Sequence, residues 1–110
     1  MPKYLLEVRY TAQGAKRLAH EGGSRRRAAI VKNVEALGGN LEVYYHAFGD
    51  VDAYIIAEFP DTATAAAVAI AVNEGGGATV KTVVLISIED IDIASKKALK
   101  VGHHGANDDL

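Results

Sequence analysis

Six polar side chains have the types and spacing that a small-molecule site would need. They stand at alternating positions of three segments that are typical of β-strands: Glu7, Arg9, Tyr44, His46, Tyr54 and Glu58. Imidazole titrates near neutral pH, so His46 is the side chain best suited to general acid–base catalysis, and Glu58 could orient it. Arg9 could hold an anionic ligand or stabilise an enolate. The two tyrosines and Glu7 would line the site as ligand-binding residues.

The same residues allow a purely structural interpretation. Polar side chains on one face of a sheet often pair across strands, so Arg9 could pair with Glu7 or Glu58. They could also form a polar network in a subunit interface. Both interpretations remain open at the level of the sequence.

Alternation of apolar and polar residues predicts the strands that would carry these side chains. The period is two in KYLLEVRY, and two further strands flank the turn-forming stretch Gly49-Asp50-Val51-Asp52 as a hairpin. A β-branched run, TVKTVVLISIE, predicts a buried strand near the C-terminal end. The predicted strands are 3–10, 40–48, 53–59 and 79–89.

Helices are predicted between these strands. Apolar residues spaced by three and four predict a helix over 25–37, with Ser24 as its N-cap and Gly38-Gly39 as its end. An alanine-rich helix over 62–73 begins at Pro60-Asp61-Thr62 and closes at the glycines 75–77. Residues 12–21 are at best a short helix, and 90–100 form another short one.

The order β-α-β-β-α-β with a C-terminal helix predicts a ferredoxin-like α+β fold with a four-stranded antiparallel sheet. Two helices cover one face of such a sheet, so the other face should be open. Alternation places these residues on the open face: Leu5, Glu7, Arg9, Glu42, Tyr44, His46, Phe48, Tyr54, Ile56 and Glu58. The last strand is apolar on both faces, which predicts a second cover. A partner copy is its natural source, so we expect a homo-oligomer.

Composition bounds the remaining possibilities. A chain of 110 residues suits one domain over 1–100 with a flexible polar tail over 101–110. The absence of cysteine excludes disulfides and thiolate sites. A formal net charge of −2 favours neither nucleic-acid nor membrane binding. The stretch MPKYLLEVRY has no signal-peptide pattern, so we expect a cytoplasmic protein. We also expect no cofactor.

Several segments together resemble one known family. Gly49-Asp50-Val51-Asp52 leads into AYIIAEFPD, an alanine-rich helix and a β-rich strand, and this order is similar to the GYD domain family. The stretches 10–14 and 35–39 are also similar, so the resemblance covers roughly residues 3–90. Gly49 and Asp52 match the motif that gives the family its name, whereas Val51 stands where the family has tyrosine. The resemblance implies a dimeric α+β barrel and no particular reaction.

Two other groups of residues could bind a metal ion, and a third could bind an anion. Asp50 and Asp52 could hold a cation with His46, and the tail holds His103-His104 and Asp108-Asp109. Neither has the ligand density of a metal loop, so the sequence predicts no metal site. The arginines 25–27 could meet an anionic partner or form a solvated helix end.

The sequence therefore predicts a homo-oligomer that binds a small organic molecule in a cleft on the open sheet face. Weak acid–base or cofactor-free enzyme activity is compatible with this prediction. The alternative is a regulatory or protein-interaction module.

Overall fold

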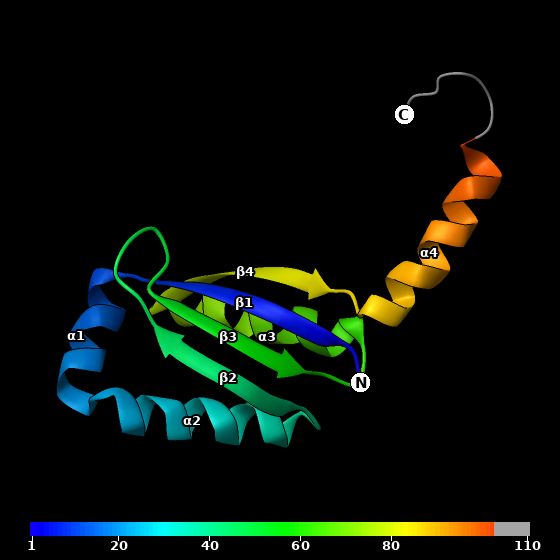
Figure 1. Cartoon of the computed structure of the whole chain (residues 1–110). Coiled ribbons are helices and arrows are strands. Elements are labelled where there is room, and N and C mark those ends of the chain that lie inside the picture. The colour runs from blue at the N-terminus through cyan, green and yellow to red at the C-terminus, as the bar shows by residue number, and fades with distance from the viewer. Residues whose placement is uncertain (103–110) are drawn as a thin grey trace.

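The computed structural model describes residues 1–102 and contains four strands and four helices (Figure 1). The predicted tail, with its two histidines, therefore lies almost entirely outside the described residues. The elements follow in the order β1 (Lys3–Tyr10), α1 (Ala12–Glu21), α2 (Gly23–Ala36), β2 (Asn40–His46), β3 (Ala53–Glu58), α3 (Thr62–Gly75), β4 (Ala78–Leu85) and α4 (Ile88–Val101).

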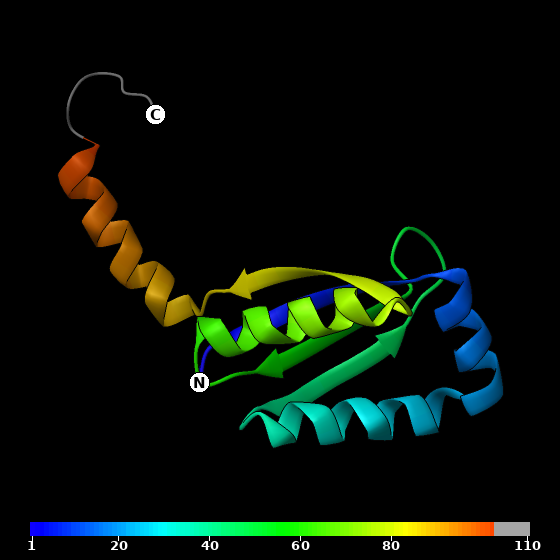
Figure 2. The same cartoon turned by 180° about the vertical axis from the view of Figure 1, so that it is seen from behind.

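The four strands form one antiparallel sheet in the order β2-β3-β1-β4. Helices α2 and α3 both lie on one side of this sheet, as the view from behind shows (Figure 2). Within residues 1–102 the other side carries no helix, so the predicted ferredoxin-like α+β fold with an open sheet face is confirmed.

The core lies between the sheet and these two helices. Strands β1 and β3 send alternating side chains toward it, which is the period-two pattern of the sequence. Val34 of α2 and Ala65 of α3 close the core from the helical side. Its other buried members are Tyr4, Leu6, Ile55, Ala57 and Phe59.

The Gly22-Gly23 pair joins two helices, α1 over the stretch where the sequence predicted at best a short helix, and α2. The prediction started a helix at residue 25 with Ser24 as its cap, but α2 begins at Gly23 and Gly22 occupies the N-cap position. Gly22 has φ +80°, a conformation that side chains disfavour. Its N–H donates to the carbonyl of Leu18, and its own carbonyl accepts from Arg26 N–H. One glycine thus ends α1 and begins α2.

The other element ends differ from the prediction by a few residues. Strand β4 ends at Leu85, where 89 was predicted, because Ser87 caps α4 by accepting from Asp90 N–H at 3.0 Å. Strand β2 ends at His46, so the predicted open-face position of Phe48 is wrong and this ring lies in a loop, fully exposed. The predicted cap of α3 is confirmed, since the Asp61 side chain accepts from Thr64 N–H at 2.8 Å.

A β-bulge in β2 changes which side chains face the helices. Leu41 lies opposite Ala57 and Val43 lies opposite Ile56, so Glu42 is an additional residue in the ladder. An additional residue shifts the alternation of everything that follows it in the strand. The second half of β2 therefore points to the side opposite to the one predicted.

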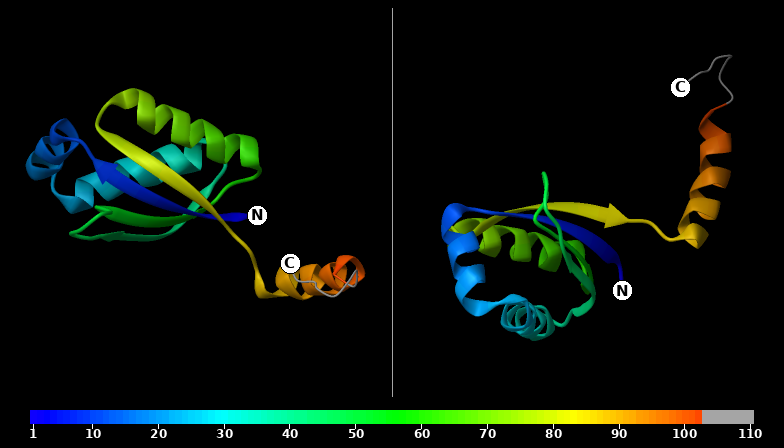
Figure 3. Two further views of the ribbon diagram at one scale, coloured as in Figure 1. Left: turned by 90° about the horizontal axis from the view of Figure 1, so that it is seen from above. Right: turned by 60° about the vertical axis from the view of Figure 1, so that its left-hand side comes forward.

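Helix α4 extends beyond the sheet, away from α2 and α3 (Figure 3). It is responsible for much of the elongated shape, which measures 59 × 29 × 22 Å. No helix within residues 1–102 is long and apolar enough to span a lipid bilayer.

Candidate functional site

A cavity of about 510 Å³ lies between α2, α3 and the helical side of the sheet. Its walls and floor are mostly apolar. Strands β1, β3 and β4 supply Leu6, Val8, Ile55 and Val80, α2 supplies Ile30 and Val34, and α3 supplies Val68, Ala71 and Val72. The alanine-rich α3 has too little side-chain bulk to reach α2, so the space between the two helices stays open.

One end of this cavity is polar. Tyr10, Tyr44 and Arg26 line it, and the two tyrosine hydroxyls lie 3.4 Å apart. The guanidinium of Arg26 pairs with Glu21 across an Nη1–Oε1 distance of 3.5 Å, and the two side chains are only 18% and 29% exposed. The α1–α2 corner at Gly22 brings these two charges together.

The pair formed by Arg26 and Glu21 leaves hydrogen-bonding capacity unused. Arg26 Nε and Glu21 Oε1 are both shielded from solvent, and neither has a hydrogen-bond partner among the described residues. Buried polar atoms are almost always bonded, so an unpartnered guanidinium N–H next to a cavity favours a ligand that brings an acceptor.

Tyr44 is held in its neutral form. Burial raises the pKa of this phenol above its ordinary value, and the hydrogen bond with Tyr10 raises it further. A phenol with a raised pKa keeps its proton and acts as a hydrogen-bond donor or acceptor, not as a base.

This pKa predicts how the stability of the protein depends on alkaline pH. In the unfolded chain Tyr44 ionises at about pH 10, whereas in the folded chain it keeps its proton. The folded state then binds more protons, so the free energy of unfolding falls as pH rises above about 10. We expect a steeper fall in wild type than in Tyr44→Phe, measured by urea unfolding at about pH 9, 10 and 11. The control Tyr45→Phe, on the exposed opposite face, should follow wild type, and a Tyr44→Phe profile parallel to wild type would contradict the assignment.

The six predicted site residues lie on two different faces of the sheet. Tyr44 lies opposite Ile55, and His46 lies opposite Ala53, so both point to the helical side. The prediction that these two residues share the open face with the others is wrong, because the bulge at Glu42 reverses their direction. The four that remain on the open face are Glu7, Arg9, Tyr54 and Glu58.

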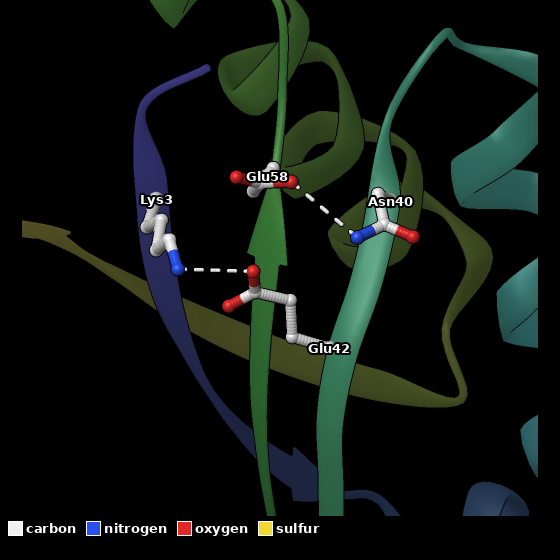
Figure 4. A network of polar contacts seen from close by, with 4 residues as sticks. All are labelled: Lys3, Asn40, Glu42 and Glu58. Carbon is white, nitrogen blue, oxygen red and sulfur yellow. Dashed lines mark hydrogen bonds and ion pairs between the residues drawn. The ribbon is translucent and has the colours of Figure 1, made fainter.

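Glu58, predicted to orient His46, has other neighbours. Its carboxylate accepts from the Asn40 side chain at 3.3 Å (Figure 4). Beside it the bulge residue Glu42 reaches across β3 to Lys3, at 3.0 Å between Nζ and Oε2. Glu58 is therefore part of a polar network between strands. This is the structural role that the sequence allowed as the alternative to catalysis.

His46 packs among aromatic side chains instead. Its ring lies 5.1 Å from the Tyr44 ring and 6.3 Å from the Tyr10 ring, between centroids. It lines a second cavity of about 440 Å³ that also includes Asp52 and Phe48. No group of three or more His, Asp and Glu side chains within residues 1–102 is placed to hold a metal ion.

The sequence interpretation missed Arg26 and Glu21, the charged pair beside the cavity. Arg26 lies within a run of three arginines that was interpreted as a solvated helix end or an anion-binding patch. A signal was present, because Arg26, Ile30 and Val34 follow at intervals of four and so share one helix face. Of the three arginines, Arg26 shares the helix face of the core residue Val34, and this pattern indicates that it points toward the interior.

The turn with Gly49 and Asp52 has a structural function. The Asp52 carboxylate accepts from Tyr10 N–H at 2.8 Å, and its backbone N–H donates to Val8. Val51, which replaces the tyrosine of the resembled family, is buried. The turn thus fastens the β2–β3 loop to the end of β1, next to the tyrosine that lines both cavities.

The hydrogen bond from Tyr10 N–H to the Asp52 carboxylate predicts that Asp52, and not Asp50, contributes strongly to stability. Asp52→Ala removes a partly buried charge-assisted acceptor and should lower the free energy of unfolding by about 2 kcal/mol. Asp50→Ala, two residues away and exposed, should change it by less than about 0.5 kcal/mol. Urea unfolding of both variants measures the difference, and equal effects would exclude the role assigned to Asp52.

Most of the chain matches one known protein family. The model of the GYD domain matches residues 4–94. Neither the curated proteins nor the solved structures include a match to the chain. The matched span covers most of the 110 residues and all of the sheet except Lys3, in agreement with the resemblance seen in the sequence. The chain therefore belongs to the GYD domain family.

Proposed function

We propose that this GYD-domain protein is a homo-oligomer that binds a small organic molecule in the cavity between α2 and α3. The observation that supports this proposal is the cavity itself, which has apolar walls and, at its polar end, the unpartnered Nε–H of Arg26. Its volume of about 510 Å³ lies in the range of small-molecule sites. The ligand would lie on the helical side of the sheet, opposite to the cleft that the sequence predicted.

The chemistry of the polar end favours a ligand with an apolar body and one anionic or carbonyl group. A guanidinium only donates hydrogen bonds, and the neutral Tyr44 phenol donates as well. The distance of 3.5 Å between Arg26 and Glu21 exceeds that of a good charge-assisted hydrogen bond. A carboxylate ligand would satisfy the guanidinium better than Glu21 does.

A fluorescent probe tests this site. Anilinonaphthalene sulfonate combines an aromatic body with an anion, so its fluorescence should rise on binding and fall when decanoate displaces it. Decanol has an alkyl chain of the same length but no charge, so it cannot pair with the guanidinium. It should displace the probe at least tenfold less well, which corresponds to about 1.4 kcal/mol in binding free energy. Equal displacement by decanoate and decanol would contradict an anion-binding end.

Neighbouring arginines supply the matched variants. Arg26→Met should weaken decanoate binding about tenfold or more, because it removes the half-buried guanidinium with its unpartnered Nε–H. Arg25→Met, exposed on the same helix, should bind decanoate like wild type. If both variants bind equally, the ligand does not contact Arg26.

Two alanines of α3 test the position of the ligand. Ala71 lines the cavity, so Ala71→Trp should fill it and abolish probe binding. Ala66 is exposed and does not line the cavity, so Ala66→Trp is the control. Retained binding in Ala71→Trp would place the probe elsewhere.

The oligomer in this proposal forms through the open sheet face. Leu5, Ile56 and Val83 are half-buried there, beside the exposed rings of Tyr45 and Tyr54. Burying such a strip against a second copy removes apolar area from water. Native mass spectrometry should show a dimer or larger species that Ile56→Lys dissociates. A monomeric wild type would contradict this part of the proposal and leave the cavity untouched.

A further inference from the structure

The second cavity, of about 440 Å³, lies where the β2–β3 loop meets the start of α1 (Figure 1). Three segments supply its walls: the end of β2 with the loop, the end of β1, and the first two turns of α1. The lining residues are Tyr10, Thr11, Ala12, Ala15, Leu18, His46, Ala47, Phe48 and Asp52.

The two cavities differ in the sign of their charge. Among the described residues, Asp52 is the only carboxylate that lines the second cavity, and no lysine or arginine lines it. Arg17 and Arg26 line the first cavity, and no carboxylate within residues 1–102 does so. The second cavity therefore favours a cation, whereas the first favours an anion.

The charge of Asp52 is not neutralised by the protein. Its side chain is half-buried, and Oδ2 accepts from Tyr10 N–H at 2.8 Å. No lysine, arginine or histidine of the described chain forms an ion pair with it. A backbone N–H satisfies one oxygen but leaves the negative charge in place, so a cation in the cavity would be attracted to it.

Three aromatic side chains line the cavity together with this carboxylate. The rings of Tyr10 and His46 lie 6.3 Å apart between centroids and are tilted by only 26°. Phe48 joins them from the loop, and its ring is fully exposed and so has no function in the core. Aromatic rings attract cations to their faces, and rings of this kind are typical of sites for quaternary ammonium groups.

Few acceptors in the cavity are left for a cation that carries N–H groups. The Thr11 hydroxyl donates to the Gly76 carbonyl at 2.8 Å and accepts from Gly14 N–H at 3.2 Å. Most of the other lining side chains are alanine, leucine or aromatic. A primary ammonium has three donors to satisfy, and burying unpaired donors costs free energy. A quaternary ammonium has none, so it suits this lining better.

We infer that the second cavity binds a quaternary ammonium group. Asp52 supplies the opposite charge, and the rings of Tyr10, His46 and Phe48 contact the N-methyl groups. The alkyl side chains at the start of α1 receive the uncharged part of the ligand. This inference does not rest on the proposed function, since Tyr10 is the only residue within 1–102 that lines both cavities.

Choline and its neutral isostere test the preference for a cation. Dimethylbutanol has carbon in place of the choline nitrogen, so the two probes share a shape and differ in charge. In calorimetric titrations of the full chain, choline should bind at least about tenfold more tightly than dimethylbutanol. Equal affinities, or no binding of choline at about 10 mM, would overturn the inference.

Two aspartates of the same turn supply matched variants. Asp52→Asn keeps an oxygen that can accept from Tyr10 N–H, but it removes the charge. It should weaken choline binding about tenfold or more. Asp50→Asn, exposed two residues away, should bind choline like wild type. If Asp52→Asn also binds choline like wild type, its carboxylate does not contact the cation and the inference is wrong.

Phe48 allows a test that leaves the core intact, because its ring is fully exposed. Phe48→Leu keeps an apolar side chain without a ring and should weaken choline binding about threefold or more. Phe48→Trp keeps a ring and should bind choline at least as tightly as wild type. The chain has no other tryptophan, so the fluorescence of this variant reports on the site, and choline should change it. Wild-type affinity in Phe48→Leu, or fluorescence unaffected by choline, would overturn the inference.

The two cavities fail or succeed separately. Arg26→Met should weaken decanoate binding and leave choline binding unchanged, since Arg26 does not line the second cavity. Asp52→Asn should have the reverse effect. Loss of choline binding with intact decanoate binding contradicts only this inference, whereas the opposite result contradicts only the proposed function.

Discussion

Phe59→Ala should lower the free energy of unfolding by about 4 kcal/mol. The Phe59 side chain has no exposed surface, and its ring centroid lies 5.8 Å from that of Tyr4 in the core. Truncation loses the transfer free energy of the ring and leaves a void between sheet and helices. Small domains have only about 5–15 kcal/mol of stability in total, so urea unfolding should show a much lower midpoint.

The other phenylalanine of the chain is the control. Phe48 is completely exposed in the β2–β3 loop, so Phe48→Ala should change the free energy of unfolding by less than about 0.5 kcal/mol. The same chemical change is thus compared in water and in the core. Similar losses in the two variants would contradict the core described here.

Gly14→Ala should cost about 3 kcal/mol, and it should weaken probe binding as well. A Cβ at Gly14 would lie 1.8 Å from the carbonyl oxygen of Gly77, so either α1 or the connection before β4 must move. The same connection is held by the bond from Thr11 N–H to Gly77 at 3.0 Å. Gly14 and Gly77 both line the cavity, so a shift changes its shape.

Gly49→Ala is the matched glycine control. A Cβ at Gly49 meets no atom within 4 Å, and Gly49 has no positive φ. Its substitution should therefore change the free energy of unfolding by less than about 1 kcal/mol. Both free energies come from urea unfolding, and probe affinity is measured beside them. A neutral Gly14→Ala would show that the contact between α1 and the β4 connection is loose.

Much of the fold could be predicted from local patterns. The alternation in β1 and β3 describes a sheet with one buried face, and Tyr4, Leu6 and Ile55 indeed enter the core. Asp61 is a helix cap whose partner is three residues away, so the sequence alone predicts it. Such features depend on residues that are close in the chain.

The glycine pair at residues 22 and 23 was only partly predictable. The sequence marks a break there, but a break can end a helix or join two. The structure uses the positive φ of Gly22 to turn the chain from α1 into α2. That turn places Glu21 beside Arg26, which no local pattern indicates.

The sequence by itself determined the α+β fold, the family and the open sheet face, since hydrophobic periodicity and turn residues are local properties. Only the tertiary structure decided which face Tyr44 and His46 occupy, because both registers of NLEVYYH place a mixture of apolar and polar side chains on either side. The bulge at Glu42 selects one register through pairing with β3, a strand distant in sequence. The cavity has the same kind of origin, because the separation of α2 and α3 is a property of packing and belongs to no single segment.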